Sequence, residues 1–147
     1  MKPIGRVKSP VTRPSDEAWG QVIAEIHVDA ALTAGLGGLD QFSHVVVVFL
    51  MHRAAFDPAR DLTRRPQGRA DMPELGIFAQ RAKHRPNPIG ITAVELVKVE
   101  NNVLTVRGLD AIDGTPVLDI KPYFPAFDQV DSAHVPEWVN RLMADYF

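Results

Sequence analysis

Two short segments concentrate charge, proline and glycine. Residues 81–90 read Arg-Ala-Lys-His-Arg-Pro-Asn-Pro-Ile-Gly, and residues 109–123 read Leu-Asp-Ala-Ile-Asp-Gly-Thr-Pro-Val-Leu-Asp-Ile-Lys-Pro-Tyr. Prolines on both sides of Asn87 push Arg85 and Asn87 into extended conformations and remove two backbone donors, so residues 85–88 cannot be helical. The first segment is therefore a rigid loop that presents cations and an amide. Such loops often carry function.

The charge of the chain is unevenly distributed. The net charge is −2, yet the window from Arg60 to Arg85 holds seven basic and three acidic residues, a net +4. The remainder holds nine basic and fifteen acidic residues, a net −6. A localised basic segment is what phosphate contact requires. The alternative is a solvated loop whose charges serve solubility.

The apolar pattern predicts a mainly β protein, because short strands alternate with turns and long helical periods are rare. This pattern favours a barrel or sandwich. The valine-rich run Val45–Leu50 is typical of a strand buried on both faces. The strands are expected at Ile4–Lys8, Gln21–Val28, Val45–Leu50, Ile77–Gln80, Ile91–Val99, Val103–Arg107 and Val117–Ile120.

Helices are expected to be minor. Residues 29–34 would form a short turn of helix, and Pro136–Tyr146 a C-terminal helix with proline in its first turn. The stretch Phe56–Leu75 exceeds the usual loop length, which predicts either function or disorder. The whole chain, residues 1–147, is expected to form one domain.

Composition excludes several classes of protein. The chain has no cysteine, so thiolate catalysis, thiolate metal sites and disulfides are absent. No stretch approaches the roughly 20 apolar residues of a spanning helix, and the start lacks the apolar core of a signal peptide, so a cytoplasmic location is expected. The glycines at 35, 37 and 38 do not form a dinucleotide-binding pattern, which argues against a Rossmann enzyme.

Several segments together resemble the TsaA-like family of S-adenosylmethionine-dependent tRNA methyltransferases. They are the two segments above, Pro3–Pro10, Gly38–His44, the run to His52, and Gly76–Arg81. The resemblance spans most of Pro3 to Asp128 in one order. It implies a single closed β-sheet barrel, with a short C-terminal helix expected from the pattern, and a homodimer. It also implies methylation of N6 on threonylcarbamoyladenosine beside the tRNA anticodon.

The resemblance also implies site residues. S-adenosylmethionine would contact His52, Arg53, Arg81, Ile91, Asp110, Ala111, Ile112 and Asp113. The acceptor nitrogen is a poor nucleophile, so a nearby base would help. The polar cluster Asp119, Lys121 and Tyr123 is the candidate for that role or for positioning, and Asp119 is expected to be buried with Lys121 or Arg85 as its partner. The tRNA anticodon loop would meet Arg64, Arg65, Arg69, Lys83, Arg85 and Asn87.

Other interpretations of these residues remain open. His52 could be a structural histidine, and Asp110 and Asp113 could serve Asx turns before Gly114. Trp19, in the short segment after Pro10, could form an aromatic wall. A protein of the same fold could act on another acceptor or only sense its ligand. A metal site at His44 and His52 is disfavoured, because eight residues on a strand separate them too far.

Overall fold

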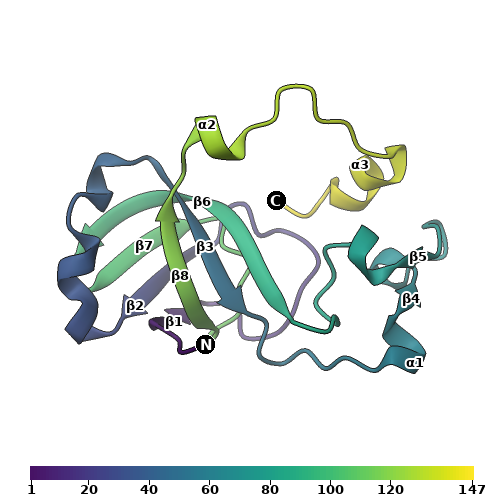
Figure 1. The fold of residues 1–147 in the computed structure, drawn as a ribbon, viewed down its shortest axis with the longest axis horizontal. Coiled ribbons are helices and arrows are strands. Elements are labelled where there is room, and N and C mark those ends of the chain that lie inside the picture. Colours follow the sequence, from purple (N-terminus) through teal and green to yellow (C-terminus); the bar gives the residue numbers. More distant parts are fainter.

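The computed structural model describes residues 1–147, and six antiparallel strands form a closed barrel (Figure 1). The order around the barrel is β1-β2-β7-β6-β3-β8, and β1 closes it by pairing with β8 through Gly5 and Val117. The predicted single-sheet barrel is confirmed. The strands are β1 (Gly5–Lys8), β2 (Ile23–Val28), β3 (His44–Leu50), β6 (Ile89–Glu100), β7 (Val103–Arg107) and β8 (Pro116–Pro122).

The barrel interior is filled by aliphatic side chains from every strand. In β2 the alternating residues Ala24, Ile26 and Val28 are buried, as the period of two predicts. In β3, Val45, Val46 and Val47 are all buried, so this strand is covered on both faces along part of its length. Alternation thus fixes which residues enter the core.

One glycine is required by a close approach. A Cβ atom at Gly90 would lie 2.4 Å from the ring of Phe49, which is paired with it across β3 and β6. Phe49 is buried, and its ring covers the position where a side chain of residue 90 would stand. Gly90 therefore lets a large ring fill this end of the barrel.

The β6–β7 hairpin forms where the sequence predicts it. Glu100 pairs with Val103, and Asn101 between them has φ 53°. Asparagine tolerates this left-handed conformation better than most residues. The Glu100–Asn102 turn is therefore confirmed.

The helices are short. The expected turn after Asp29 is the 3-10 helix η1 (Ala30–Leu36), which continues through Gly35; Asp29 caps it by accepting from the Ala31 amide. The C-terminal helix is α3 (Glu137–Met143), so Pro136 precedes it. The remaining two helices outside the lobe are η2 (Leu39–Gln41) and α2 (Pro125–Asp128). No helix has the length and apolarity to cross a bilayer.

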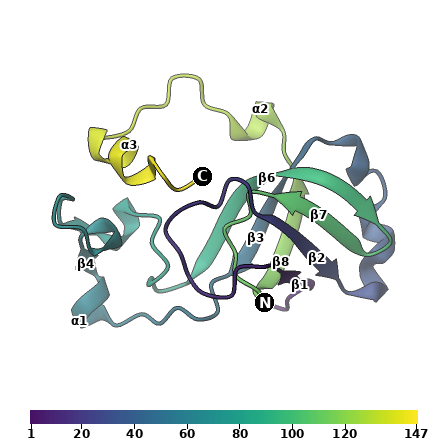
Figure 2. The same cartoon turned by 180° about the vertical axis from the view of Figure 1, so that it is seen from behind.

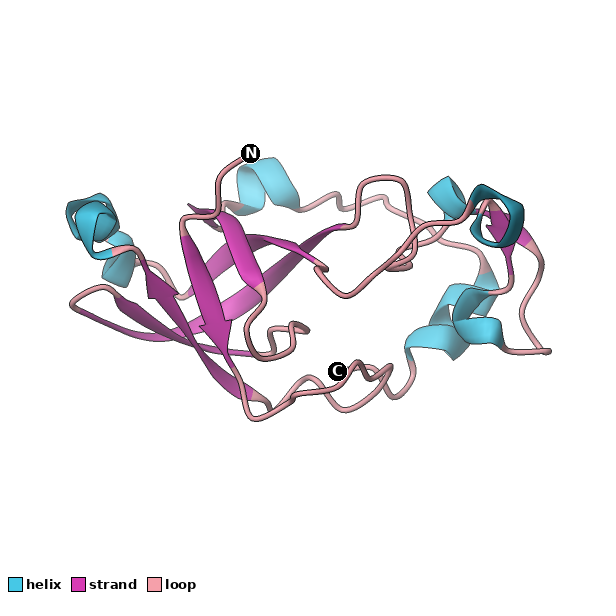
Figure 3. Cartoon of the chain, turned by 90° about the horizontal axis from the view of Figure 1, so that it is seen from below, coloured by secondary structure: helices cyan, strands magenta, loops and turns pink.

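Residues 56–80 form a lobe beside the barrel (Figure 3). Part of it is the stretch for which function or disorder was expected, and it is ordered. The prediction of a strand at Ile77–Gln80 is wrong, because residues 77–79 form a 3-10 turn. The lobe contains α1 (Pro58–Asp61), β4 (Thr63–Arg64), η3 (Pro66–Gly68), β5 (Leu75–Gly76) and η4 (Ile77–Ala79).

Candidate functional site at one end of the barrel

Most of the predicted cofactor residues gather at one end of the barrel. There β3 ends at Leu50 and is paired with Ile89, where β6 begins. β2 runs antiparallel to both β1 and β7, so β1 and β7 point in the same direction and end near the start of β2. The segments that follow β1 and β7 therefore reach this same end of the barrel. Figure 2 shows the N-terminal loop and the C-terminal tail coming back to this region. We call it the site end.

Asp110 is held by two hydroxyl groups. Thr92 of β6 donates to one carboxylate oxygen at 2.5 Å, and the Tyr146 hydroxyl donates to the other at 2.6 Å. Burial, followed by the negative charge of Asp110, raises the pKa of Tyr146 well above its usual range. Tyr146 therefore stays protonated and remains a donor. Asp110 is half-buried, so it is within reach of a ligand.

The rest of the 110–113 segment is anchored to the N-terminal loop. Asp113 accepts from the Ser9 amide at 3.0 Å, and its own amide donates to the Val11 carbonyl at 2.8 Å. Ala111 and Ile112 are buried, and Ala111 belongs to the core. Their side chains are packing groups, so the backbone is what they present to a ligand.

Two arginines are held by backbone carbonyls at the site end. Arg81 donates to the Ile91 carbonyl at 2.6 Å, and Arg53 donates to the Thr12 carbonyl at 3.0 Å. A guanidinium carries five N–H donors, and each of the two arginines uses one donor in these bonds. The neighbouring His52 is exposed, and so is Ile91, at 52%. Both arginines can bind an anionic group.

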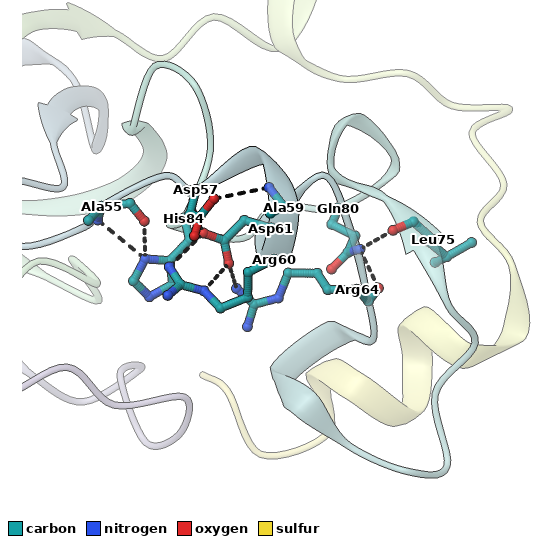
Figure 4. A network of polar contacts seen from close by, with 9 residues as sticks. All are labelled: Ala55, Asp57, Ala59, Arg60, Asp61, Arg64, Leu75, Gln80 and His84. Atoms are coloured by element: carbon teal, nitrogen blue, oxygen red, sulfur yellow. Dashed lines mark hydrogen bonds and ion pairs between the residues drawn. The ribbon is translucent and has the colours of Figure 1, made fainter.

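The lobe is built around a buried carboxylate (Figure 4). Arg60 donates twice to Asp61, at 3.0 and 2.8 Å, and the Asp57 amide donates at 2.9 Å. These donors hold the pKa of Asp61 well below its usual range. Arg64 lies 3.5 Å from the same carboxylate. Two cations of the Arg60–Arg85 window thus have their partner within the lobe.

Other predicted RNA-contacting residues also have internal partners. Arg65 donates to the Met72 carbonyl, Arg69 pairs with Asp71 at 2.7 Å, and Arg85 donates to the Gln80 carbonyl at 2.9 Å. Lys83 and Asn87 take part only through their backbone carbonyls, which accept from the Arg85 amide at 3.0 Å and the Ile89 amide at 2.8 Å. The arginines order the loop, and their charge still gives the window its positive sign.

The predicted catalytic residues are not brought to the site end. Asp119 and Lys121 form a 2.6 Å ion pair, with side chains 46% and 66% exposed. Both are in β8 on the outer face, because Ile120 between them packs against the core and neighbouring residues of a strand point to opposite sides. A shift in the β3–β8 register between Val48 and Phe49 breaks the alternation, so that Val117 can also face the core. Tyr123 follows β8 and contacts the ring of His44, at the far end of β3. The expectation that Asp119 is buried is wrong; its partner is Lys121.

The structure also settles the positions of two histidines and a tryptophan, and it adds two residues to the candidate site. His44 begins β3 and His52 lies beyond its end, so the two stand at opposite ends of the strand. Trp19 is buried, and its indole donates to the Ser15 carbonyl, which makes it a packing residue and not an exposed wall. Thr92 and Tyr146 were not among the predicted site residues. Nothing local in the sequence marks them, because Asp110 lies 18 and 36 residues away.

The fold and the candidate site define a β-barrel domain with polar side chains gathered at one end. Residues 8–129 match the family described as tRNA-methyltransferase O N-terminal domain. The chain belongs to this family. It superimposes on a crystal structure of TrmO from Pseudomonas aeruginosa with a TM-score of 0.73 and 35% identity, covering 90% of this chain and 59% of that one.

Two curated relatives differ in length. An S-adenosyl-L-methionine-binding protein of Archaeoglobus fulgidus is 39% identical over 135 residues, which cover 89% of this chain and 94% of that protein. A human tRNA (adenine(37)-N6)-methyltransferase is 41% identical over 111 residues, which cover 76% of this chain and 23% of that protein. The chain therefore matches nearly all of the archaeal relative and under a quarter of the human one.

Proposed function

We propose that this protein is an S-adenosylmethionine-dependent tRNA methyltransferase whose cofactor binds at the site end. The observation that supports it is the convergence of Asp110, Arg81 and Arg53 at one end of a barrel of this family. The acceptor we propose is N6 of threonylcarbamoyladenosine next to the anticodon. The protein would work in the cytoplasm, where tRNA is modified.

The chemistry of the donor set fits this cofactor. S-adenosylmethionine carries hydroxyl and ammonium donors, a carboxylate, a sulfonium and an adenine. Asp110 can accept from the donors, and Arg53 or Arg81 can meet the carboxylate through unused N–H groups. The half-buried aromatic ring of Tyr146 provides a surface that a cation or a purine can contact. The bound cofactor supplies an electrophilic methyl group.

The chain's own residues must orient the acceptor and accept its proton. The nitrogen lies between a purine and a carbonyl, so it is a weak nucleophile with an acidic proton, and alignment supplies much of the rate. Asp119, Lys121 and Tyr123 remain the proposed base or positioning groups. Asp119 and Lys121 lie on the outer face of β8, and Tyr123 follows β8 at the far end of the barrel. Their participation therefore requires a second protomer that brings them to the site end of its partner. A homodimer is therefore part of the proposal.

The lobe and its following loop are the proposed contact with the anticodon loop. Their arginines are rigidly held, so they present charge with little loss of side-chain freedom on binding. The side chains of Lys83 and Asn87 have no hydrogen bond or ion pair within the protein, so binding to RNA would break none. A protein that neutralises several phosphates loses affinity steeply as salt rises.

A second candidate function is that of an S-adenosylmethionine-binding protein that acts on another acceptor or serves as a sensor. The archaeal relative of nearly equal length carries only the name of a binding protein, which favours this alternative. The two candidates share the cofactor site and differ in the need for tRNA.

The experiment is a calorimetric titration with S-adenosylmethionine, followed by labelled methyl transfer to tRNA from cells that lack the endogenous methyltransferase. We expect binding and transfer, with the label in the modified adenosine beside the anticodon. Lys83→Ala should reduce the salt dependence of tRNA binding by about one phosphate contact and leave cofactor affinity unchanged. Binding without transfer on any tRNA would favour the second candidate, and no binding would refute both.

A further inference from the structure

The C-terminal tail, residues 144–147, returns to the barrel and pairs with the N-terminal loop. The Ala18 amide donates to the Asp145 carbonyl and the Trp19 amide donates to the Tyr146 carbonyl, both at 2.8 Å. A Cβ atom at Gly20 would lie 2.6 Å from the backbone of Phe147. The tail is thus seated closely on residues 18–20, and Trp19 is buried there.

The helix before the tail is fixed to the lobe. Arg141 of α3 donates to the Asp71 carbonyl at 3.2 Å and pairs with Glu137. The C-terminal segment therefore contacts the lobe through α3 and the barrel through the tail, as its path in Figure 1 shows. These contacts place Tyr146 over the site end. Tyr146 lies beyond residues 8–129, the part of the chain that matches the family and that carries the other site residues.

Tyr146 acts on one residue of the site. Its hydroxyl donates to Asp110 at 2.6 Å, opposite the hydroxyl of Thr92 on the other carboxylate oxygen. A carboxylate offers about four lone-pair sites, and these two donors occupy two of them. The donors fix the rotation of the carboxylate, and two sites stay available to a ligand. Arg81 and Asp16 are close enough to influence the hydroxyl electrostatically.

We propose that Tyr146 is a positioning residue for the cofactor site. Together with Thr92 it holds the Asp110 carboxylate in the orientation that accepts from S-adenosylmethionine, and the tail forms one wall of the site. The inference rests on the proposed function, since it assumes that Asp110 contacts the cofactor. It adds a requirement that the motifs do not contain, namely that residues 144–147 are part of the site.

The test is calorimetric binding of S-adenosylmethionine to Tyr146→Phe, which removes the hydroxyl and keeps the ring and the backbone pairing. We expect the Kd to rise about tenfold, because a charged acceptor loses one of its donors. The KM for the cofactor should rise with kcat little changed, as for an interaction made equally in ground and transition states. The melting temperature of the ligand-free protein serves as the measure of folding.

The matched control is Thr33→Val, which removes another side-chain hydroxyl bond, from Thr33 to the Ala30 carbonyl in η1 at the far end of the barrel. We expect its cofactor affinity to equal that of the wild type. Thr92→Val should weaken binding like Tyr146→Phe, and the double variant should lose less than the product of the two single effects, because both act through Asp110.

Three results would overturn the inference. If Tyr146→Phe binds within twofold of the wild type, the hydroxyl does not position Asp110. If only the melting temperature falls, the tail has a structural role alone. If Tyr146→Ala binds more tightly than the wild type, the tail competes with the cofactor. In each case the wild type still binds, whereas a wild type without binding would refute the proposed function itself.

Discussion

The barrel and the lobe bury different kinds of side chains. The barrel core is aliphatic and aromatic, with Ile26, Phe49 and Leu104 among its members. The lobe buries the carboxylate of Asp61 and the amide of Gln80 beside Met72 and Ile77. Apolar burial is non-directional, whereas a buried carboxylate is stable only while its donors remain in place. The barrel should therefore tolerate small geometric changes, and the lobe should respond sharply to the loss of one partner.

The largest effect is expected in the barrel. Phe49→Ala should cost about 3–5 kcal/mol of unfolding free energy, because it removes a buried ring and leaves a cavity over Gly90. Chemical denaturation followed by fluorescence would measure it. The matched control is Phe78→Ala in the lobe, since Phe78 is 78% exposed and should change stability by less than about 0.5 kcal/mol. Equal effects at the two positions would contradict the assignment of the core.

A smaller and more local effect is expected in the lobe. Asp61→Asn should speed amide exchange across residues 57–80 on the order of tenfold, with exchange in β3 and β6 unchanged. The variant removes the charge that Arg60 and Arg64 share. Asp71→Asn is the control, because the Asp71 side chain is 52% exposed and its pair with Arg69 contributes little.

The pH dependence of the lobe has a defined sign. The pKa of Asp61 is lowered in the folded protein, so its carboxylate stabilises the lobe at any pH above its unfolded pKa of about 4. The stabilisation is lost as the pH falls below that value. The opening of the lobe, measured as amide exchange relative to the intrinsic rate at each pH, should therefore rise between about pH 4 and pH 2 more in the wild type than in Asp61→Asn. An identical rise in both proteins would contradict the role of Asp61.

The difference between barrel and lobe also explains what the sequence could predict. The barrel strands follow a period of two or a run of valines, and the turn at Asn101 has an evident conformational cause. The lobe has no such period, because its order comes from Asp61 and Gln80 bonding to neighbours along an irregular path. The strand predicted at Ile77–Gln80 failed for this reason: Ile77 and Gln80 are both buried, and three residues of separation suit a 3-10 turn.

The site was predictable to the extent that its residues lie in one segment or at strand ends. Arg53, Arg81 and Asp110 follow or precede strands that meet at one end of the barrel, as the resemblance implied. Tyr146 contacts Asp110 only because the tail folds back over the N-terminal loop. That contact depends on tertiary structure across 36 residues, and no short-range pattern encodes it.

The smallest effect on stability is expected outside both regions, at the exposed pair of Asp119 and Lys121. Asp119→Asn should change the unfolding free energy by less than about 0.5 kcal/mol, because both side chains are largely solvated. If Asp119 serves as base or positioning group, methyl transfer should nevertheless fall by about 100-fold or more, with cofactor affinity unchanged. Glu100→Gln is the control, since Glu100 forms another exposed pair, with Lys98. Full turnover in Asp119→Asn would show that this surface ion pair has no part in catalysis, and the base would have to be sought at the site end.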